Sequence, residues 1–268
     1  TPGITGTSAA QPLSKRPLMH ILITGASGNV GGALARQLAA PGVSLSLWGR
    51  DEARLAEIAS LCEARGAAAA WQAVDLANLD TALALLSDLD ARQPFDMALL
   101  VAGLGGTQAP DDLVENAAQV ARQCHLNLTV PAAMAAHLGA RMGKRGRGKI
   151  GIIGSAAGFH ALPFAPSYAG SKAGLARFAD ALRLAARRHG VTITLAAPGF
   201  IAAPAPRDNN GARPFEMPVE KAAAAIIAGV MQGRARIIFP KRFIALRWLD
   251  QVLPRPLRDR LLLALPAP

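Results

Sequence analysis

The sequence is poor in cysteine, in aromatic residues and in long apolar runs. Its two cysteines, Cys62 and Cys124, match neither a metal-binding spacing nor a disulfide framework, so we expect reduced thiols, a cytoplasmic protein and no bound metal. No apolar run reaches the ~18 residues that span a bilayer, and residues 1–18 lack the apolar centre of a signal peptide. These absences argue against a secreted disulfide scaffold and against an integral membrane protein.

Acidic residues are also scarce, because 18 Asp and Glu stand against 29 Lys and Arg, a net charge of +11. A basic chain raises the question of a nucleic-acid partner. The charge is concentrated, however: residues 234–268 hold eight basic and two acidic residues. A second basic cluster, at 141–149, is rich in glycine and has no aromatic side chain for base stacking. We therefore predict no nucleic-acid partner.

Short apolar runs alternate with Ala- and Leu-rich stretches of helical period. The apolar runs predict strands at 18–24, 43–48, 69–74, 96–102, 149–154, 191–197 and 235–239. The stretches between them predict helices at about 30–40, 52–65, 79–90, 112–142, 167–189 and 218–233. This alternation predicts an α/β fold: a single Rossmann-type, doubly wound parallel sheet of about seven strands in the order 3-2-1-4-5-6-7, with helices on both faces. Ligands of such sheets bind beyond the carboxyl ends of the strands.

Glycines follow the first predicted strand and open the first helix. Gly25, Gly28 and Gly31 allow a tight turn, and the helix N-terminus beyond them offers free N–H groups to a pyrophosphate. The second strand ends at Gly49 and Arg50, where an acidic residue would select NAD(H). A guanidinium at this place pairs with a 2′-phosphate instead, so the sequence favours NADP(H) over NAD(H).

Three polar side chains have a spacing that indicates acid–base chemistry. Ser155 follows a predicted strand, and Tyr168 and Lys172 lie four residues apart on a predicted helix, hence on one face. A phenol ionises at pH ~10, and roughly 4 kcal/mol of stabilisation would bring its pKa to about 7. The lysine ammonium would supply part of this. Tyr168 is thus predicted to exchange a proton with a carbonyl or alcohol oxygen that Ser155 holds.

The segments "TGASGNVG", "VDL", "LN", "IIGSAAG", "YAGSK" and "PGFI" together resemble the short-chain dehydrogenase/reductase family, over nearly all of residues 19–240. The resemblance implies Tyr168 as the catalytic acid/base and Ser155 as the group that orients the substrate. It also implies that Lys172 binds the nicotinamide ribose and lowers the pKa of Tyr168, and that Asn127 holds a water of a proton relay. The cofactor site that it implies also contains Gly25, Ser27, Asn29, Val30, Gly31, Arg50, Asp75, Leu76, Ala102, Gly103, Pro198, Gly199 and Ile201. The predicted activity is an NADP(H)-dependent interconversion of a carbonyl and a secondary alcohol.

Some positions depart from the family pattern. Asn29 stands where a glycine is common, Leu100 and Val101 replace two asparagines, and Ala203 replaces a threonine. The glycine spacing matches the sugar-nucleotide branch of the family, so an epimerase or dehydratase is one alternative. A non-catalytic NADP(H)-binding sensor is another.

The remaining segments bear on substrate and partners. Residues 201–217 are predicted to form a substrate flap or a plain surface loop, with Phe215 and Met217 as apolar contacts and Arg207 or Arg213 as anion contacts. Phe200 is a further candidate substrate contact, and His160 lines the pocket or packs beneath it. The domain plan is a flexible extension at 1–18, an NAD(P)-binding domain at 19–240 and a basic amphipathic tail at 241–268.

The tail has three alternative partners: an anionic membrane, a second subunit, or the protein's own core. The first alternative would place the protein at the inner face of a membrane. The family resemblance adds the expectation of a homodimer or homotetramer.

Overall fold

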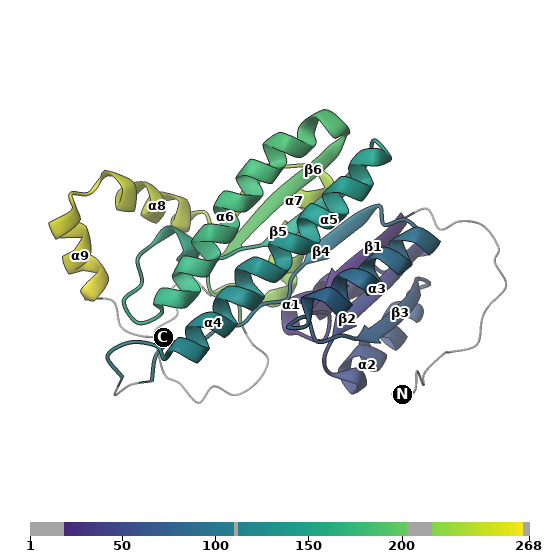
Figure 1. Cartoon of the computed structure of the whole chain (residues 1–268), viewed down its shortest axis with the longest axis horizontal. Helices are drawn as coiled ribbons and strands as arrows, with labels where there is room; N and C mark the ends of the chain where they lie inside the picture. Colours follow the sequence, from purple (N-terminus) through teal and green to yellow (C-terminus); the bar gives the residue numbers. More distant parts are fainter. Residues whose placement is uncertain (1–18, 110–111, 203–215, 265–268) are drawn as a thin grey trace.

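The computed structural model describes residues 19–109, 112–202 and 216–264 and contains one seven-stranded parallel sheet (Figure 1). Its strand order, β3-β2-β1-β4-β5-β6-β7, confirms the predicted fold class and order. The strands are β1 (Met19–Thr24), β2 (Val43–Gly49), β3 (Ala68–Ala73), β4 (Met97–Leu100), β5 (Gly148–Ile153), β6 (Val191–Pro198) and β7 (Arg236–Phe239). β1 has no exposed side chain from Ile21 to Ile23, as expected for a strand covered on both faces.

Helices cover both faces and create two apolar cores. One core joins α1 (Asn29–Leu38), α2 (Glu52–Glu63) and α7 (Val219–Met231) to the sheet. The other core joins α3 (Leu79–Arg92), α5 (Val130–Lys144) and α6 (Pro166–Ala186) to the opposite face. Neighbouring residues of one strand divide between the cores: Leu47 of β2 belongs to the first and Trp48 to the second. This alternation follows from the two-residue period of a strand.

β2 and β3 lie on one side of β1, whereas β4 and the later strands lie on the other side. The site lies at this switch point, between β1 and β4. Both strands run parallel, with Thr24 opposite Leu100 at their carboxyl ends. The Thr24 hydroxyl accepts hydrogen bonds from the backbone N–H of Val101 (3.0 Å) and of Ala102 (3.3 Å). The switch point of the sheet is therefore fixed by a side chain of the first strand.

The predicted helix at 112–142 is shorter and interrupted. It begins as α4 (Ala117–Cys124), passes through one π-helical segment (His125–Thr129) and continues as α5. Asn116 caps α4 by accepting from the N–H of Gln119 at 2.9 Å, which explains the later start.

The C-terminal tail is folded in part onto the domain. It forms α8 (Arg242–Val252) and α9 (Arg255–Leu263), which Figure 1 shows at the opposite end of the molecule from β3. Phe243 of α8 is buried, and its ring occupies the space that a side chain at Gly199 would need. The alternative of packing on the protein's own core thus holds for the start of α8. The predicted extension at 1–18 and the loop residues Ala203, Arg207, Arg213 and Phe215 lie outside the described residues.

Candidate active site

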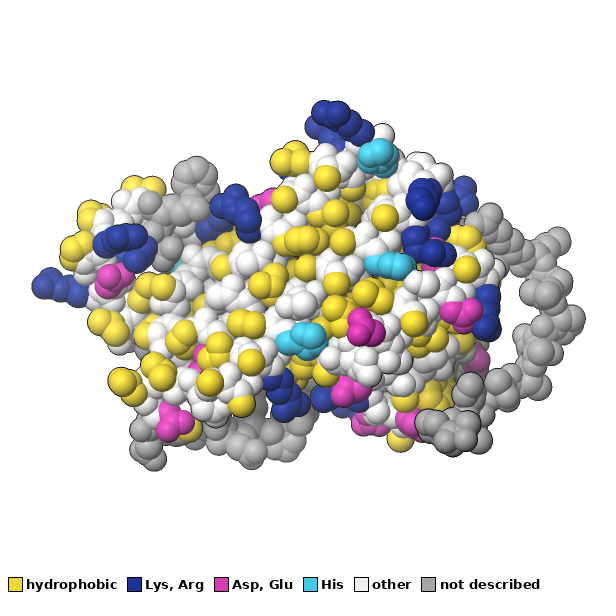
Figure 2. Space-filling model, in the orientation of Figure 1, with side chains coloured by type: hydrophobic (Ala, Val, Ile, Leu, Met, Phe, Trp, Pro, Cys, Tyr) yellow, Lys and Arg dark blue, Asp and Glu magenta, His cyan; other side chains and the backbone are white. Residues whose placement is uncertain are grey.

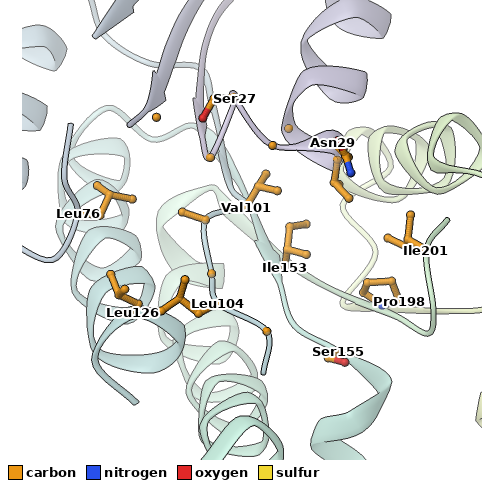
Figure 3. Close-up of a pocket in the computed structure, with 18 of the residues that line it drawn as sticks. Ser27, Asn29, Leu76, Val101, Leu104, Leu126, Ile153, Ser155, Pro198 and Ile201 are labelled. Carbon is orange, nitrogen blue, oxygen red and sulfur yellow. The ribbon is translucent and has the colours of Figure 1, made fainter. Parts of the chain in front are cut away.

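A cleft of about 470 Å³ opens at the carboxyl edge of the sheet. In Figure 3, Ser27 lies at one end and Ser155 at the other, with Val101 and Ile153 between them. All of the predicted cofactor residues line this cleft, together with Ser155: Gly25, Ser27, Asn29, Val30, Gly31, Arg50, Asp75, Leu76, Ala102, Gly103, Tyr168, Lys172, Pro198, Gly199 and Ile201. The cleft volume falls within the usual range for cofactor pockets.

The glycine turn at the end of β1 leaves a helix N-terminus open to the cleft. Gly25 has φ +67°, and a side chain there would lie 2.9 Å from the Cα of Ala102. A side chain at Gly31 would collide with the carbonyl of Gly25. The first residue before α1, Gly28, provides no side-chain cap, and the first turn of α1 has no acidic residue. The free N–H groups and the helix dipole therefore favour an anion at this end of the cleft.

The end of β2 borders the same part of the cleft. A side chain at Gly49 would lie 2.5 Å from the hydroxyl oxygen of Ser27, so it would crowd the Ser27 side chain at this point of the cleft. Arg50 is exposed and lines the cleft beside it. Asp75, which follows β3, lines the cleft and also accepts from the N–H of Ala77 at 3.0 Å. This backbone contact is compatible with the predicted contact of Asp75 to the cofactor.

Ser155 and Tyr168 are brought together at the other end. Ser155 follows β5, its Oγ accepts from the N–H of Ala157 at 3.1 Å, and it lies close enough to the Tyr168 phenol to lower the pKa of that phenol. α6 begins at Pro166, whose fixed φ suits the first turn of a helix. Tyr168 follows in that first turn. Lys172 lies one turn further, with its Nζ 6.0 Å from the centre of the Tyr168 ring.

The electrostatics of this group differ from the expectation. Burial raises the pKa of Tyr168 above its ordinary value, and the Ser155 side chain offsets this only in part. Burial also lowers the pKa of Lys172 to about 8. The Lys172 Nζ donates to the carbonyl of Ile153 at 3.0 Å rather than to the phenol. The predicted lowering of the Tyr168 pKa by Lys172 is therefore not seen: loss of water around the phenol raises the pKa, and the ammonium is engaged by the Ile153 carbonyl.

Asn127 lies beneath the cleft wall in the π-helical segment, a geometry that often marks functional sites. Its side chain is fully buried. The Oδ1 accepts from the N–H of Leu104 at 2.7 Å, and the Nδ2 donates to the carbonyl of Leu104 at 2.9 Å. A side chain at Gly103 would lie 2.9 Å from this Oδ1 and 3.3 Å from the Lys172 Nζ. Asn127 thus anchors the chain after β4 close to Lys172, and its place in a proton relay stays a prediction.

Two glutamines that were not identified from the sequence also anchor the chain after β4. Gln119 donates to the carbonyl of Thr107 at 3.1 Å, and Gln123 donates to the carbonyl of Gly105 at 3.5 Å. Gln123 also accepts from the hydroxyl of Ser167 at 2.8 Å, the residue before Tyr168. We call Gln119, Gln123 and Asn127 the carboxamide ladder. Its signal in the sequence is a carboxamide at every fourth residue of one helix.

The proposed substrate residues are only partly placed. His160 and Phe200 are not among the residues that line the cleft, and Phe215 lies outside the described part of the chain. Met217 pairs with Ile201 in an isolated parallel bridge, which holds the two ends of segment 201–217 together. Their roles toward a substrate stay predictions.

The sheet, the open helix N-terminus and the cleft define a dinucleotide-binding protein of the Rossmann type. The family model for short chain dehydrogenases matches residues 19–213. The chain belongs to the short-chain dehydrogenase/reductase family and is an oxidoreductase of that family. An uncharacterized oxidoreductase of Myxococcus xanthus is 32% identical over 239 residues, which cover 89% of this chain and 94% of that protein.

Two solved structures are similar across most of their length. One is the bulky-bulky ketone specific alcohol dehydrogenase from Comamonas testosteroni, with 27% identity, a TM-score of 0.75, and coverage of 88% of this chain and 93% of that chain. The other is a short-chain dehydrogenase from Sphingobium yanoikuyae in complex with NADPH, with 26% identity, a TM-score of 0.75, and coverage of 87% and 94%.

Within residues 19–109, 112–202 and 216–264, no helix has the length and apolar character needed to cross a bilayer. The same described residues contain no group of three or more His, Cys, Asp or Glu side chains that is able to hold a metal ion.

Proposed function

We propose that this chain is an NADP(H)-preferring oxidoreductase that interconverts a carbonyl and a secondary alcohol, with Tyr168 as the general acid and base. The observation that carries the proposal is that Ser155 and Tyr168 line the same cleft as an uncapped helix N-terminus, with Ser155 acting on the pKa of the phenol. The cleft joins an anion site to a proton donor, and a reaction that moves a hydride and a proton to one carbonyl needs both.

The residues present fit a dinucleotide phosphate. The free N–H groups at the start of α1 suit the pyrophosphate, and the glycines at 25 and 31 keep the chain close to it. Arg50 borders the same end, where its guanidinium would pair with a 2′-phosphate. The solved relative from Sphingobium yanoikuyae, which is in complex with NADPH, supports the same preference.

When bound, NADPH supplies a hydride to the carbonyl carbon of the substrate. Tyr168 would give its proton to the carbonyl oxygen as the hydride leaves the nicotinamide, so that the phenolic O–H and the C=O π bond break while a new O–H and a new C–H bond form on the substrate. The Ala157 N–H already occupies an acceptor site of Ser155, which leaves the serine hydroxyl hydrogen to donate to the same oxygen. Lys172, protonated at neutral pH with a pKa of about 8, stabilises the phenolate that remains on Tyr168.

The alternatives make different predictions for turnover. A sugar-nucleotide epimerase would return its cofactor to the starting redox state and show no net consumption of NADPH. A sensor would bind the cofactor without turnover. Membership of an oxidoreductase family favours the enzyme over the sensor.

The test is an assay of NADPH consumption with a panel of ketones and aldehydes. The panel includes bulky ketones, because the related alcohol dehydrogenase from Comamonas testosteroni is specific for them. We expect turnover with at least one carbonyl, tighter binding of NADPH than of NADH, and a loss of kcat of about 100-fold or more in Tyr168→Phe.

The variant must keep the melting temperature and the NADPH affinity of the unaltered enzyme for the comparison to count. A Tyr168→Phe enzyme that keeps its full kcat would overturn the role of Tyr168. Equal affinities for NADH and NADPH would overturn the cofactor preference.

A further inference from the structure

The C-terminal arm, which comprises residues 241–264, is attached to the domain at one end and exposed at the other. Its first helix, α8, is fixed by the buried ring of Phe243. Its second helix, α9, has no buried residue among those described. Figure 1 shows α9 at the margin of the molecule, away from the sheet.

Apolar side chains on this outer helix face the solvent. Leu257 and Leu261 are 48% and 50% exposed and lie four residues apart, so they share one face of α9. Leu263, and Val252 at the end of α8, are each 73% exposed. Single exposed apolar residues are common on protein surfaces, but several on one short segment indicate a surface that binds something.

Basic residues accompany these leucines. The arm holds six Lys and Arg against two Asp, a net charge of +4. Arg255 and Arg260 of α9 are exposed, whereas Arg258 is paired with Asp259 at 2.9 Å. Figure 2 shows the same mixture, with yellow apolar and dark blue basic side chains together at the α8–α9 end.

We propose that the C-terminal arm docks the enzyme on an anionic lipid surface, with Leu257 and Leu261 entering the headgroup region and the arginines pairing with lipid phosphates. A helix with exposed leucines and flanking arginines binds such a surface through apolar burial and charge attraction together. The charge favours an anionic lipid surface over a second copy of the chain. Two arms packed face to face would each carry a net charge of +4 and would repel each other.

The attachment of the arm gives docking a consequence for the enzyme. Phe243 packs against Gly199, which lines the cleft. Arg247 of α8 lies over the ring of Phe159, with its guanidinium carbon 4.7 Å from the ring centre, and Phe159 is four residues beyond Ser155. The arm thus starts beside the Gly199 wall of the cleft and also contacts the segment that follows Ser155. If the proposed function holds, docking would bring this end near the membrane, where a lipophilic carbonyl compound is concentrated.

The experiment measures sedimentation of the full chain with vesicles of phosphatidylglycerol and phosphatidylcholine, compared with vesicles of phosphatidylcholine alone. It needs no activity, so its outcome is independent of the proposed function. We expect binding to the anionic vesicles, and weaker binding in 1 M salt, where the screening length falls to about 3 Å. Arg255→Gln and Arg260→Gln are each expected to weaken binding about fivefold.

The double variant Leu257→Glu/Leu261→Glu is expected to lose binding while keeping its melting temperature. Leu61→Glu is the matched control, because Leu61 lies on α2 and is 43% exposed; it should bind as the unaltered chain does. Equal binding by the double variant, or no binding to anionic vesicles at low salt, overturns the proposal. Light scattering gives the subunit count in parallel. If the unaltered chain does not bind vesicles and the double variant has fewer subunits than the unaltered chain, the Leu257/Leu261 face of α9 contacts a second copy of the chain instead.

Discussion

At the residue scale, the site depends on the protonation states of Tyr168 and Lys172. The structure favours a neutral phenol beside a lysine that is charged at neutral pH but close to losing its proton. A neutral Tyr168 is ready to donate a proton, so this state suits carbonyl reduction. Alcohol oxidation needs the phenolate, and its rate is therefore expected to rise with pH.

Tyr168 is the single tyrosine of the chain, so its ionisation is directly visible in the ultraviolet absorbance. Because burial raises its pKa, we predict that the tyrosinate signal appears at a higher pH in the folded protein than in the denatured chain. The same titration in denaturant gives the reference value. Addition of NADP⁺ is expected to move the midpoint down, because the oxidised nicotinamide is cationic. A folded-state midpoint below that of the denatured chain would contradict an upward shift of the Tyr168 pKa.

At the scale of helices and strands, the sequence predicted the features that follow from a regular spacing of apolar residues. All seven strands and their order followed from apolar runs and alternating helices. The edge of the sheet that holds the cleft followed as well, because strand ends of a parallel sheet share one edge, whereas most of the individual cofactor residues came from the family resemblance. The interruption between α4 and α5 was not predicted, since its π-helical segment has the same apolar pattern as an ordinary helix. The direction of the Tyr168 pKa shift was predicted wrongly, because it depends on burial in the folded chain.

The carboxamide ladder belongs to the same scale, and its middle member provides a test. Gln123 is buried and joins the carbonyl of Gly105 in the cleft wall to the hydroxyl of Ser167 at the start of α6. Gln123→Ala leaves both groups without this partner, which costs about 1–3 kcal/mol. We expect a melting temperature lower by several degrees and a reduced kcat, because Tyr168 directly follows Ser167.

Gln119→Ala is the matched control for this variant. It removes the same functional group from the same helix, but Gln119 is only half-buried, and its side chain donates to the carbonyl of Thr107 and not to the start of α6 in the described part of the chain. Calorimetry and steady-state kinetics on both variants decide the question. Equal losses in the two variants would show that the ladder acts only as general helix support.

At the scale of the whole molecule, the active site lowers the stability of the fold. Lys172 is 5% exposed, and burial lowers its pKa from 10.5 to about 8. This shift corresponds to about 3 kcal/mol of unfolding free energy, which the fold loses at neutral pH by burying a charged ammonium. Enzymes often retain such destabilising groups because the chemistry needs them.

The loss of stability caused by burying the Lys172 ammonium depends on pH. The variant Lys172→Met makes this dependence measurable. Between pH 8 and 10.5 the unfolded chain keeps the lysine proton while the folded chain loses it, so wild-type stability rises with pH relative to the variant. We predict that the difference in unfolding free energy between the two proteins changes by about 3 kcal/mol across this window. Below pH 8 the difference is constant, because the lysine is protonated in both states. Denaturant titrations at pH 7, 8, 9 and about 10.5 measure it.

Lys149→Met serves as the control, since Lys149 also donates to a backbone carbonyl, that of Met231 at 3.0 Å, but does so at the surface. Its difference from wild type should stay flat over the same pH range. A flat difference for Lys172→Met as well would mean that water reaches this ammonium in the folded protein. Lys172 would then carry its full charge well above pH 8, and alcohol oxidation would keep its cationic support at the alkaline pH where the phenolate forms.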